Sequence, residues 1–356
     1  MMLRNAGFFL VFVIPVLVVL GAIGGSWAAG GAIAFVFAVV PAVDAIVGRD
    51  RRNPGEAMPP PWQRAWFDVP LFAWVAVQLL VQLWLVARVA AAPTWGLAEV
   101  LAIVSLGLMT GGIGITIAHE LMHRSGRVPR ALAEVLMSSV GYGHFCIEHV
   151  HGHHRNVATP ADPASSRLGE GLWSFLPRTL VGGWRSAWAI ECARLARAGH
   201  GPLHPGNRML RYAASALAIT AALAATLGPT GALAWLAQAA VAVFMLEIVN
   251  YVEHYGLSRE RNADGRFERV QPWHSWNASL RVSNWLLFNL QRHSDHHFLA
   301  SRPYWALRHY EDVPQLPAGY ATMVLLALVP PLWRSVMDPR VAAARSAAVR
   351  SLPQAA

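Results

Sequence analysis

Long apolar runs alternate with short polar segments along this chain of 356 residues. A helix needs about 20 predominantly apolar residues to cross the hydrocarbon core of a membrane. Six runs reach that length, and the connections near residues 24–26, 92–95 and 227–229 leave room only for tight turns. The pattern therefore predicts three helical hairpins, with spans at residues 7–23, 27–47, 66–91, 96–118, 209–226 and 230–250.

The arginines lie mainly in the longer segments that connect one hairpin to the next, and the three short connections hold none. Arginine and lysine are enriched on the cytoplasmic side of membrane proteins. We therefore expect both termini and all long loops on the cytoplasmic side of a bacterial inner membrane. The arginines that carry this prediction include Arg49, Arg51, Arg52, Arg64, Arg124, Arg127 and Arg130.

The composition agrees with a membrane protein, because only 14% of the residues are charged and 55% are hydrophobic, whereas soluble domains carry about 25% charged residues. The formal net charge of +9 does not indicate nucleic-acid binding, since the arginines are dispersed. Anionic lipid headgroups and an acidic partner protein are better candidates. The first apolar run lacks a small-residue cleavage site, so we interpret it as a retained span rather than a signal peptide.

Two further segments are apolar without matching a span. Residues 172–195 mix aromatic residues with arginines, which predicts a helix lying at the membrane surface. Residues 318–337 contain Pro330-Pro331 and are expected to form a re-entrant or surface helix. The predicted fold class is an all-α integral membrane protein with six transmembrane helices and a cytoplasmic helical cap. One domain would cover residues 1–340, and residues 341–356 would form a flexible C-terminal tail.

Nine histidines in four clusters stand beside these spans, all on the predicted cytoplasmic side. Residues three or four apart share one face of a helix. Within each cluster the side chains should therefore converge; His149 and His153 should point the same way, with His154 as a neighbouring ligand. The nine candidate metal ligands are His119, His123, His149, His153, His154, His254, His293, His296 and His297.

Imidazole is a common ligand of iron, copper and zinc, and nine histidines exceed what one ion can use. The clusters therefore predict a pair of metal ions. Cys146 and Cys192 cannot build a thiolate site alone, which argues against structural zinc. His119-Glu-Leu-Met-His123 fits the His-Glu-x-x-His pattern of zinc proteases, but the remaining clusters count against a single-ion protease. Two histidine-ligated irons that activate dioxygen are the favoured hypothesis.

Several carboxylates lie next to these histidines in the sequence. We expect them to accept hydrogen bonds from the ring N–H groups of the ligands and so to fix the ring orientation. The candidates are Glu120, Glu148, Glu253 and Asp295, and Glu247 is added because an ionisable group at the inner end of a span is functional by default. Asn250 lies beside Glu247 and is given the same role.

The other six histidines, His144, His151, His200, His204, His274 and His309, are expected to be structural. His274 is the strongest exception, as a hydrogen-bond donor near the metals. Gln78 and Gln82 are expected to make hydrogen bonds between helices. Asp44, near the inner end of the second span, is expected to pair with an arginine of the following loop.

The chain resembles the membrane-bound alkane 1-monooxygenases, within the wider fatty acid desaturase-like superfamily. The most specific motifs are Asn250-Tyr-Val-Glu-His-Tyr-Gly-Leu257 and Leu290-Gln-Arg-His-Ser-Asp-His-His297. Similar stretches at residues 44–56, 273–277, 316–320 and 334–339 extend the resemblance over most of the region from about residue 40 to 340.

The resemblance implies a six-span bundle, two iron ions with the same nine histidine ligands, and terminal hydroxylation of medium-chain n-alkanes to primary alcohols with O2. It also implies electron delivery by rubredoxin, with rubredoxin reductase and NAD(P)H upstream. No Cys-x-x-Cys pair exists in the chain, so rubredoxin would be a separate protein. The apolar substrate would come from the bilayer through a channel, with Phe35 and Phe37 as candidates for limiting its chain length.

Two kinds of alternative remain open at this point. A fatty acyl desaturase or a hydroxylase of aryl methyl groups would use the same ligands, because pocket shape decides between these reactions. A non-enzymatic membrane protein that binds or transports metal is the alternative from a different class. The position of the clusters at one rim of the spans counts against transport, since transporters place their sites near the bilayer midplane.

Overall fold

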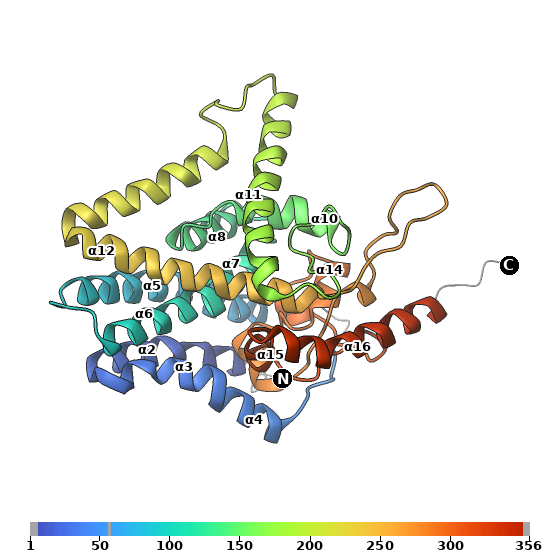
Figure 1. Cartoon of the computed structure of the whole chain (residues 1–356), viewed down its shortest axis with the longest axis horizontal. Coiled ribbons are helices and arrows are strands. Elements are labelled where there is room, and N and C mark those ends of the chain that lie inside the picture. Colours follow the sequence, from blue (N-terminus) through green and yellow to red (C-terminus); the bar gives the residue numbers. More distant parts are fainter. Residues whose placement is uncertain (1–5, 56–57, 352–356) are drawn as a thin grey trace.

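The computed structural model describes residues 6–55 and 58–351, and this part of the chain is helical. Only three isolated β-bridges and no strand occur among the described residues. The predicted all-α fold class is therefore confirmed. The long helices run side by side, with their turns gathered at one end and the short helices of the cap at the other (Figure 1).

Five continuous helical stretches in the described chain are long and apolar enough to cross a membrane. The first two are Gly7–Gly24 and Ser26–Val47, and the third is α5 (Pro61–Ala90). The fourth, Leu97–Met122, and the fifth, α12 (Arg208–His254), end at the histidine clusters. The stretches built from several helices comprise η1 (Gly7–Phe12) and α2 (Val13–Gly24); η2 (Ser26–Gly30), α3 (Gly31–Ala34), η3 (Phe35–Val39) and α4 (Val40–Val47); and α6 (Leu97–Leu108), η4 (Met109–Gly114) and α7 (Ile115–Met122).

Helix α12 contains a break at Gly228, where φ is 73° and ψ is 177°. Glycine adopts a positive φ without the steric cost of a Cβ atom. Figure 1 shows the chain reversing direction here, so that the two halves of α12 form a hairpin. The predicted spans at residues 209–226 and 230–250 lie on either side of this break. The count of six spans stays a prediction, because the structure holds no membrane.

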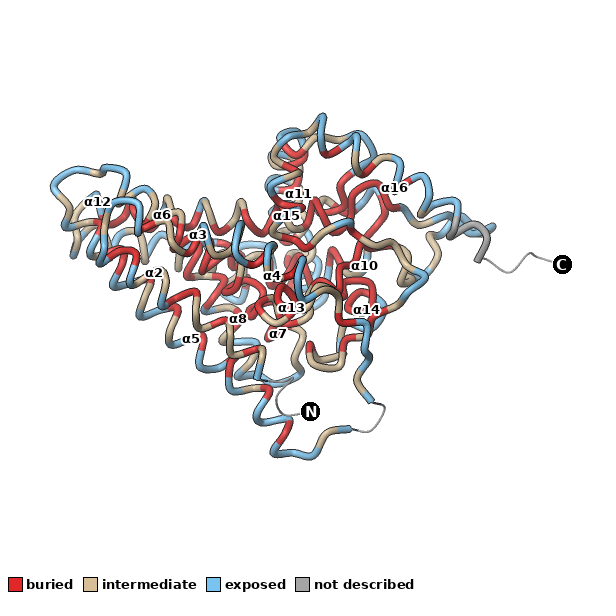
Figure 2. The backbone as a smooth tube through the Cα atoms, turned by 90° about the horizontal axis from the view of Figure 1, so that it is seen from below, coloured by how far each residue is buried: buried red, intermediate tan, exposed pale blue. Residues whose placement is uncertain are grey.

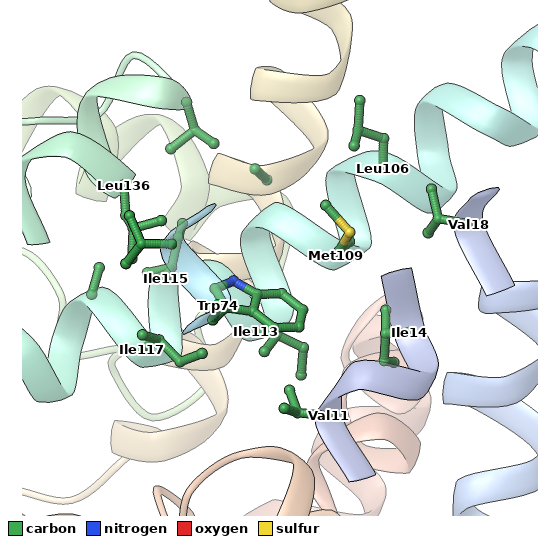
Figure 3. Close-up of a cluster of buried hydrophobic side chains, with 14 of the residues drawn as sticks. Val11, Ile14, Val18, Trp74, Leu106, Met109, Ile113, Ile115, Ile117 and Leu136 are labelled. Carbon is green, nitrogen blue, oxygen red and sulfur yellow. The ribbon is translucent and has the colours of Figure 1, made fainter. Parts of the chain in front are cut away.

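Helix α5 anchors the bundle through polar contacts in its apolar interior. Trp74 packs beside Ile113 (Figure 3) and donates to Gln78 Oε1 at 2.8 Å. Gln78 Nε2 donates to Ser139 Oγ at 3.2 Å, and Gln82 Nε2 donates to Ser139 O at 2.7 Å. Ser139 ends α8 (Arg127–Ser139). The predicted interhelical role of both glutamines is confirmed, and these bonds fix the cap on the bundle.

The π-helical turn η4 places α7 against the rest of the bundle. A Cβ atom on Gly111 would come within 2.6 Å of Ala242 Cα, and one on Gly114 within 2.0 Å of Gln78 Oε1. These glycines let α12 and α5 approach the turn closely. The turn leads directly into the helix that carries His119.

Among the described residues, no arginine pairs with Asp44, so the expectation that it pairs with an arginine of the following loop was wrong. Its carboxylate accepts hydrogen bonds from the backbone N–H groups of Val282 at 2.7 Å and Ser283 at 3.1 Å, and from the Ser283 hydroxyl. These groups belong to the first turn of α13 (Arg281–Leu286), where free N–H groups need acceptors. Asp44 therefore ties the second apolar stretch to the cap.

The cap is a set of short helices around the inner ends of the long ones. Figure 2 shows that burial is concentrated where α7, α10, α13 and α14 meet. The remaining elements of the cap are α9 (Phe145–Glu148), η5 (His149–His153), α10 (His154–Asn156), α11 (Leu172–Arg197), η6 (Pro272–His274), α14 (His293–Phe298), η7 (Tyr304–Ala306), α15 (Tyr320–Ala327) and α16 (Pro330–Ser351).

The cap contains the segments that the sequence predicted to be a surface helix, a re-entrant or surface helix, and a C-terminal tail. Helix α11 covers the segment predicted at the membrane surface, and its Trp173 and Trp184 are exposed. The segment 318–337 forms parts of two helices, α15 and α16, rather than one. The start predicted for the C-terminal tail, residue 341, falls inside α16, where Val341 is buried. Residues 352–356 of that tail lie outside the described residues.

Candidate metal centre

The structure brings the nine predicted histidines together in two adjoining groups, each of which can hold a metal ion. Within each group the candidate ligand nitrogens all lie within 4.8 Å of one another. The first group consists of His119, His123, His149, His154 and His296, and the second of His153, His254, His293 and His297.

In the first group, α7 contributes His119, and His123 directly follows its last residue. His149 comes from η5, His154 from α10 and His296 from α14. The Nε2 atoms of His149 and His154 lie 3.0 Å apart, and those of His154 and His296 also lie 3.0 Å apart. The Nε2 atoms of His119 and His123 are buried and have no hydrogen-bond partner. The five imidazoles thus bring one candidate ligand nitrogen each within 4.8 Å of the others.

In the second group, the Nε2 atom of His293 is 3.2 Å from that of His254 and 2.9 Å from that of His297. The Nε2 atom of His297 is 3.2 Å from that of His153. All four side chains are buried. Helix α14 supplies His293 and His297, and His254 is the last residue of α12.

These distances fit metal coordination. An imidazole nitrogen bonds a metal such as zinc at about 2.0–2.1 Å, so two such nitrogens at right angles around one ion lie about 3.0 Å apart. Metal ligation also requires neutral rings. Burial lowers the pKa of His123 to about 4 and lowers the pKa of His149 and His297 well below the ordinary value. These three rings are therefore neutral and able to bind a cation at neutral pH.

The division of the clusters differs from the expectation that His149 and His153 point the same way. Residues 149–153 form a π-helical turn, which holds more residues per turn than an α-helix. His149 consequently meets His154, five positions on, and His153 turns to the second group. Helix α14 is divided similarly, because His296 joins the first group while His293 and His297 join the second.

Two of the predicted carboxylates contact arginines instead of histidine rings. Glu120 Oε1 accepts from Arg124 Nε at 2.8 Å, and its Oε2 accepts from the backbone N–H of Tyr304 at 3.2 Å. Asp295 pairs with Arg302 and accepts the Tyr310 hydroxyl at 2.7 Å. Neither bonds a ligand ring, so the expected contacts are corrected for both. These carboxylates hold the 302–310 segment against the site.

Two others are buried without a ring contact. Glu247 accepts from the hydroxyls of Tyr142 and Thr179, both at 2.8 Å, and from Asn250 Nδ2 at 3.2 Å. It therefore bridges α12 to α11, and Asn250 supports it rather than a histidine. Glu148 leaves Oε1 without a hydrogen-bond partner, and burial raises the pKa of Glu148 to about 8. Of the five predicted carboxylates, only Glu253 contacts a ligand ring, with Oε2 at 3.2 Å from His293 Nε2.

The carboxylate that does orient a ligand was missed by the sequence reasoning. Asp162 Oδ2 lies 2.9 Å from His153 Nδ1 and accepts from Ser165 Oγ at 2.6 Å, while Oδ1 accepts from the backbone N–H of Ala164 at 3.1 Å. Burial alone would lower the pKa of His153, but the charge and hydrogen bond of Asp162 raise it. A carboxylate behind a ligand ring fixes both its tautomer and its direction.

The charges around the two groups also suit cations. Glu120 and Asp295 have arginine partners. In contrast, Asp162 and Glu253 are buried against the ligand rings of His153 and His293, and no arginine of the described chain is within ion-pair distance of them. Uncompensated carboxylates are costly in a protein interior. Bound divalent ions would offset that cost, so the donor set and its surroundings fit a pair of metal ions.

None of the other six histidines joins either group. His274, the expected exception, donates from Nε2 to Glu268 Oε1 (3.1 Å), and its Nδ1 accepts from the backbone N–H of Gln271 (3.0 Å). It therefore stabilises the 258–276 loop and does not contact the ligands. His309 bonds Ser279, and His151 is exposed between two ligands. The two cysteines are free.

An apolar cavity leads from the long helices to the histidines. It encloses about 990 Å³ of empty space, counting the part that is open to the outside. Ile14, Val36 and Phe37 of the long helices line it, and so do His119, His149 and His293 of the histidine groups. The cavity thus reaches both groups. Phe37, expected to face the substrate channel, lines it, whereas Phe35 packs against the core of the bundle.

Comparison with known proteins agrees with this architecture. The family model described as fatty acid desaturase matches residues 93–327. Alkane 1-monooxygenase 2 of Pseudomonas aeruginosa is 45% identical over 314 residues, which cover 87% of this chain and 83% of that protein. Alkane 1-monooxygenase of Acinetobacter baylyi is 39% identical over 305 residues, covering 85% of this chain and 74% of that protein.

A more distant relative is the xylene/toluene monooxygenase hydroxylase component of Pseudomonas putida. It is 31% identical over 231 residues, which cover 65% of this chain and 61% of that protein. The identities to the alkane 1-monooxygenases are higher and extend over more of the chain. The chain therefore belongs to the alkane 1-monooxygenases, a family of oxygenases within the fatty acid desaturase family.

Proposed function

We propose that this protein hydroxylates the terminal methyl group of medium-chain n-alkanes to give primary alcohols, with O2 and two iron ions held by the nine histidines. The observation that carries the proposal is the apolar cavity lined by His119 and His149 of the first histidine group and by His293 of the second. A saturated chain offers no polar group for recognition, so an apolar tunnel with metal ligands at its end matches such a substrate.

The choice of iron rests on the donor set. Imidazoles with nearby carboxylates are typical of non-haem iron sites that use dioxygen, and no thiolate belongs to either group. A bound iron pair would supply the activation of dioxygen, which side chains cannot perform. The balanced reaction converts an alkane, O2, two protons and two electrons into an alcohol and water.

The side chains of the chain itself supply exclusion of water and alignment of the substrate. Aliphatic side chains, among them Val36 and Leu290, make up most of the cavity wall. Such a wall keeps water away from the reacting carbon. Asp162 holds the ring of His153. A narrow cavity that points toward the histidines would bring the end of an extended chain to them first, which favours the terminal methyl group.

The electron donor in this proposal is rubredoxin, reduced by rubredoxin reductase with NAD(P)H. Exposed arginines support an acidic partner near the metal centre: Arg155 directly follows His154, and Arg167 and Arg345 border a surface pocket that also contains Asp162. Complementary charge steers such encounters. This side of the protein would face the cytoplasm, with the long helices in the inner membrane and the termini on the cytoplasmic side.

Hydroxylation of aryl methyl groups is the second candidate, and the similarity to the xylene/toluene monooxygenase component favours it. Desaturation of a fatty acyl chain is a third possibility within the matched family model. The wall of the cavity offers few charged groups for a headgroup or carrier, which makes a hydrocarbon the better match. Products from octane, a methylbenzene and a fatty acyl substrate would separate these reactions.

The proposal can be tested with membranes that contain the protein, supplemented with rubredoxin, its reductase, NADH and octane under O2. We expect 1-octanol from the parent, none from His254→Ala, and parental amounts from His151→Ala, because His151 lies outside both groups. Absence of alcohol from a parent that holds two irons per chain would refute octane as the substrate. A parent that binds no iron would refute the proposed chemistry altogether.

A further inference from the structure

Two carboxylates contact rings of the second histidine group, but at different ring nitrogens. Asp162 lies 2.9 Å from Nδ1 of His153, whose Nε2 faces the other ligands. Glu253 instead lies 3.2 Å from Nε2 of His293, the same nitrogen that meets His254 and His297. Asp162 is therefore behind its ring, whereas Glu253 is on the side where a metal ion would be bound.

The contact distance of Glu253 matches the donor spacing inside the group. The Nε2 atoms of the four histidines approach one another at 2.9–3.2 Å, and Glu253 Oε2 approaches His293 Nε2 at 3.2 Å. Glu253 precedes the ligand His254 on the last turn of α12. An oxygen at this spacing from a ligand nitrogen has the geometry of a further donor to the same ion.

No arginine of the described chain pairs with Glu253, and its polar neighbour apart from the histidines is the neutral hydroxyl of Tyr320. Glu253 is 3% exposed, its Oε1 atom has no hydrogen-bond partner, and it lines the apolar cavity. Glu120 and Asp295, in contrast, are paired with arginines. A divalent ion bound by the adjoining histidines would offset the charge of this carboxylate.

We propose that Glu253 is an oxygen ligand of the ion held by the second histidine group. The first group then uses five nitrogen donors and the second uses four nitrogens and one oxygen. A mixed histidine and carboxylate set suits non-haem iron. This inference rests on the proposed function, in which both groups hold iron. It also makes the two iron positions chemically different, with the carboxylate on the side of the substrate cavity.

The test measures ferrous iron rather than turnover. The parent, Glu253→Ala, Glu253→Gln and the control Glu247→Gln are loaded with 57Fe, and iron per chain, release to a chelator and Mössbauer spectra are compared. Glu247→Gln is a matched control, because Glu247 is a buried carboxylate of the same helix that bonds Tyr142, Thr179 and Asn250 but no histidine.

We expect the parent and Glu247→Gln to hold two irons with the same spectrum. In Glu253→Ala, one of the two irons should bind at least about tenfold more weakly, and the signal of that iron alone should change. Glu253→Gln keeps the shape of the side chain, so it answers the question even if the alanine variant does not fold. Two irons with parental affinity and spectrum in the glutamine or alanine variant would overturn the inference, whereas a parent without iron would overturn the proposed function.

Discussion

Replacing Asp162 by asparagine isolates the effect of the one carboxylate that lies behind a ligand ring. Both oxygens of Asp162 are acceptors: Oδ2 for His153 Nδ1 and Ser165 Oγ, and Oδ1 for the N–H of Ala164. Asparagine offers one oxygen and one NH2 group. If its oxygen faces Ala164, its NH2 faces Nδ1 and moves the ring proton to Nε2, the nitrogen that should bind metal.

The alternative orientation of the amide is also unfavourable, because its NH2 would then face the N–H of Ala164. Loss of such an orienting partner typically lowers metal affinity 10- to 100-fold, which corresponds to about 1.4–2.7 kcal/mol. We therefore expect Asp162→Asn to lose affinity for one of two ferrous ions by this factor. Competition with a chelator, followed by iron analysis, measures the change.

The control variant is Glu170→Gln, which changes a carboxylate of the same loop. Glu170 pairs with Arg178 at 2.7 Å and contacts no histidine. It should retain both irons at parental affinity. Equal affinity of Asp162→Asn and the parent for both ions would refute the reasoning, because it would show that packing alone sets the direction of the His153 ring.

Changes in the cavity wall, at a loop histidine and in pH should each affect a different property of the protein. Gly112→Phe should shift product formation toward shorter alkanes, because a Cβ atom at Gly112 meets nothing within 4 Å and the residue lines the cavity; an unchanged octane-to-dodecane ratio would contradict this. His274→Ala should keep the parental iron content, since His274 bonds Glu268 and the backbone of Gln271. The folded metal-free protein keeps His123 neutral down to a pKa of about 4, lowered by burial from 6.5. The unfolded chain therefore takes up a proton first, and stability should fall as the pH drops from about 6.5 to about 4, by up to about 3 kcal/mol at about 1.4 kcal/mol for each pH unit; a flat profile in denaturant titrations would contradict this.

The sequence pattern predicted which histidines come together but not how they divide. Apolar runs and clustered imidazoles are local signals, and the structure brings the same nine residues into contact. The division depends on the π-helical turn at residues 149–153. An α-helical spacing rule pairs His149 with His153, whereas one extra residue in the turn pairs His149 with His154. Their role as metal ligands stays a prediction.

The carboxylates were harder to predict for a geometric reason. Adjacent residues on a helix point about 100° apart, so an acid next to a ligand in sequence usually faces elsewhere. Glu120 and Asp295 accordingly face arginines. Asp162 lies in a loop nine positions after His153 and reaches its ring only because the loop folds back. Loop closure of this kind leaves no periodic signal in the sequence.

The division of the histidines makes the two sites mechanically dependent. His153 and His154 are joined by one peptide bond yet belong to different groups, and the same is true of His296 and His297. An ion that orders one of these histidines would also order the backbone of the adjacent histidine, which belongs to the other group. The ordering cost of the second site is thereby largely met when the first is filled, which favours cooperative loading. The parent protein should accordingly take up its second ion more readily than its first.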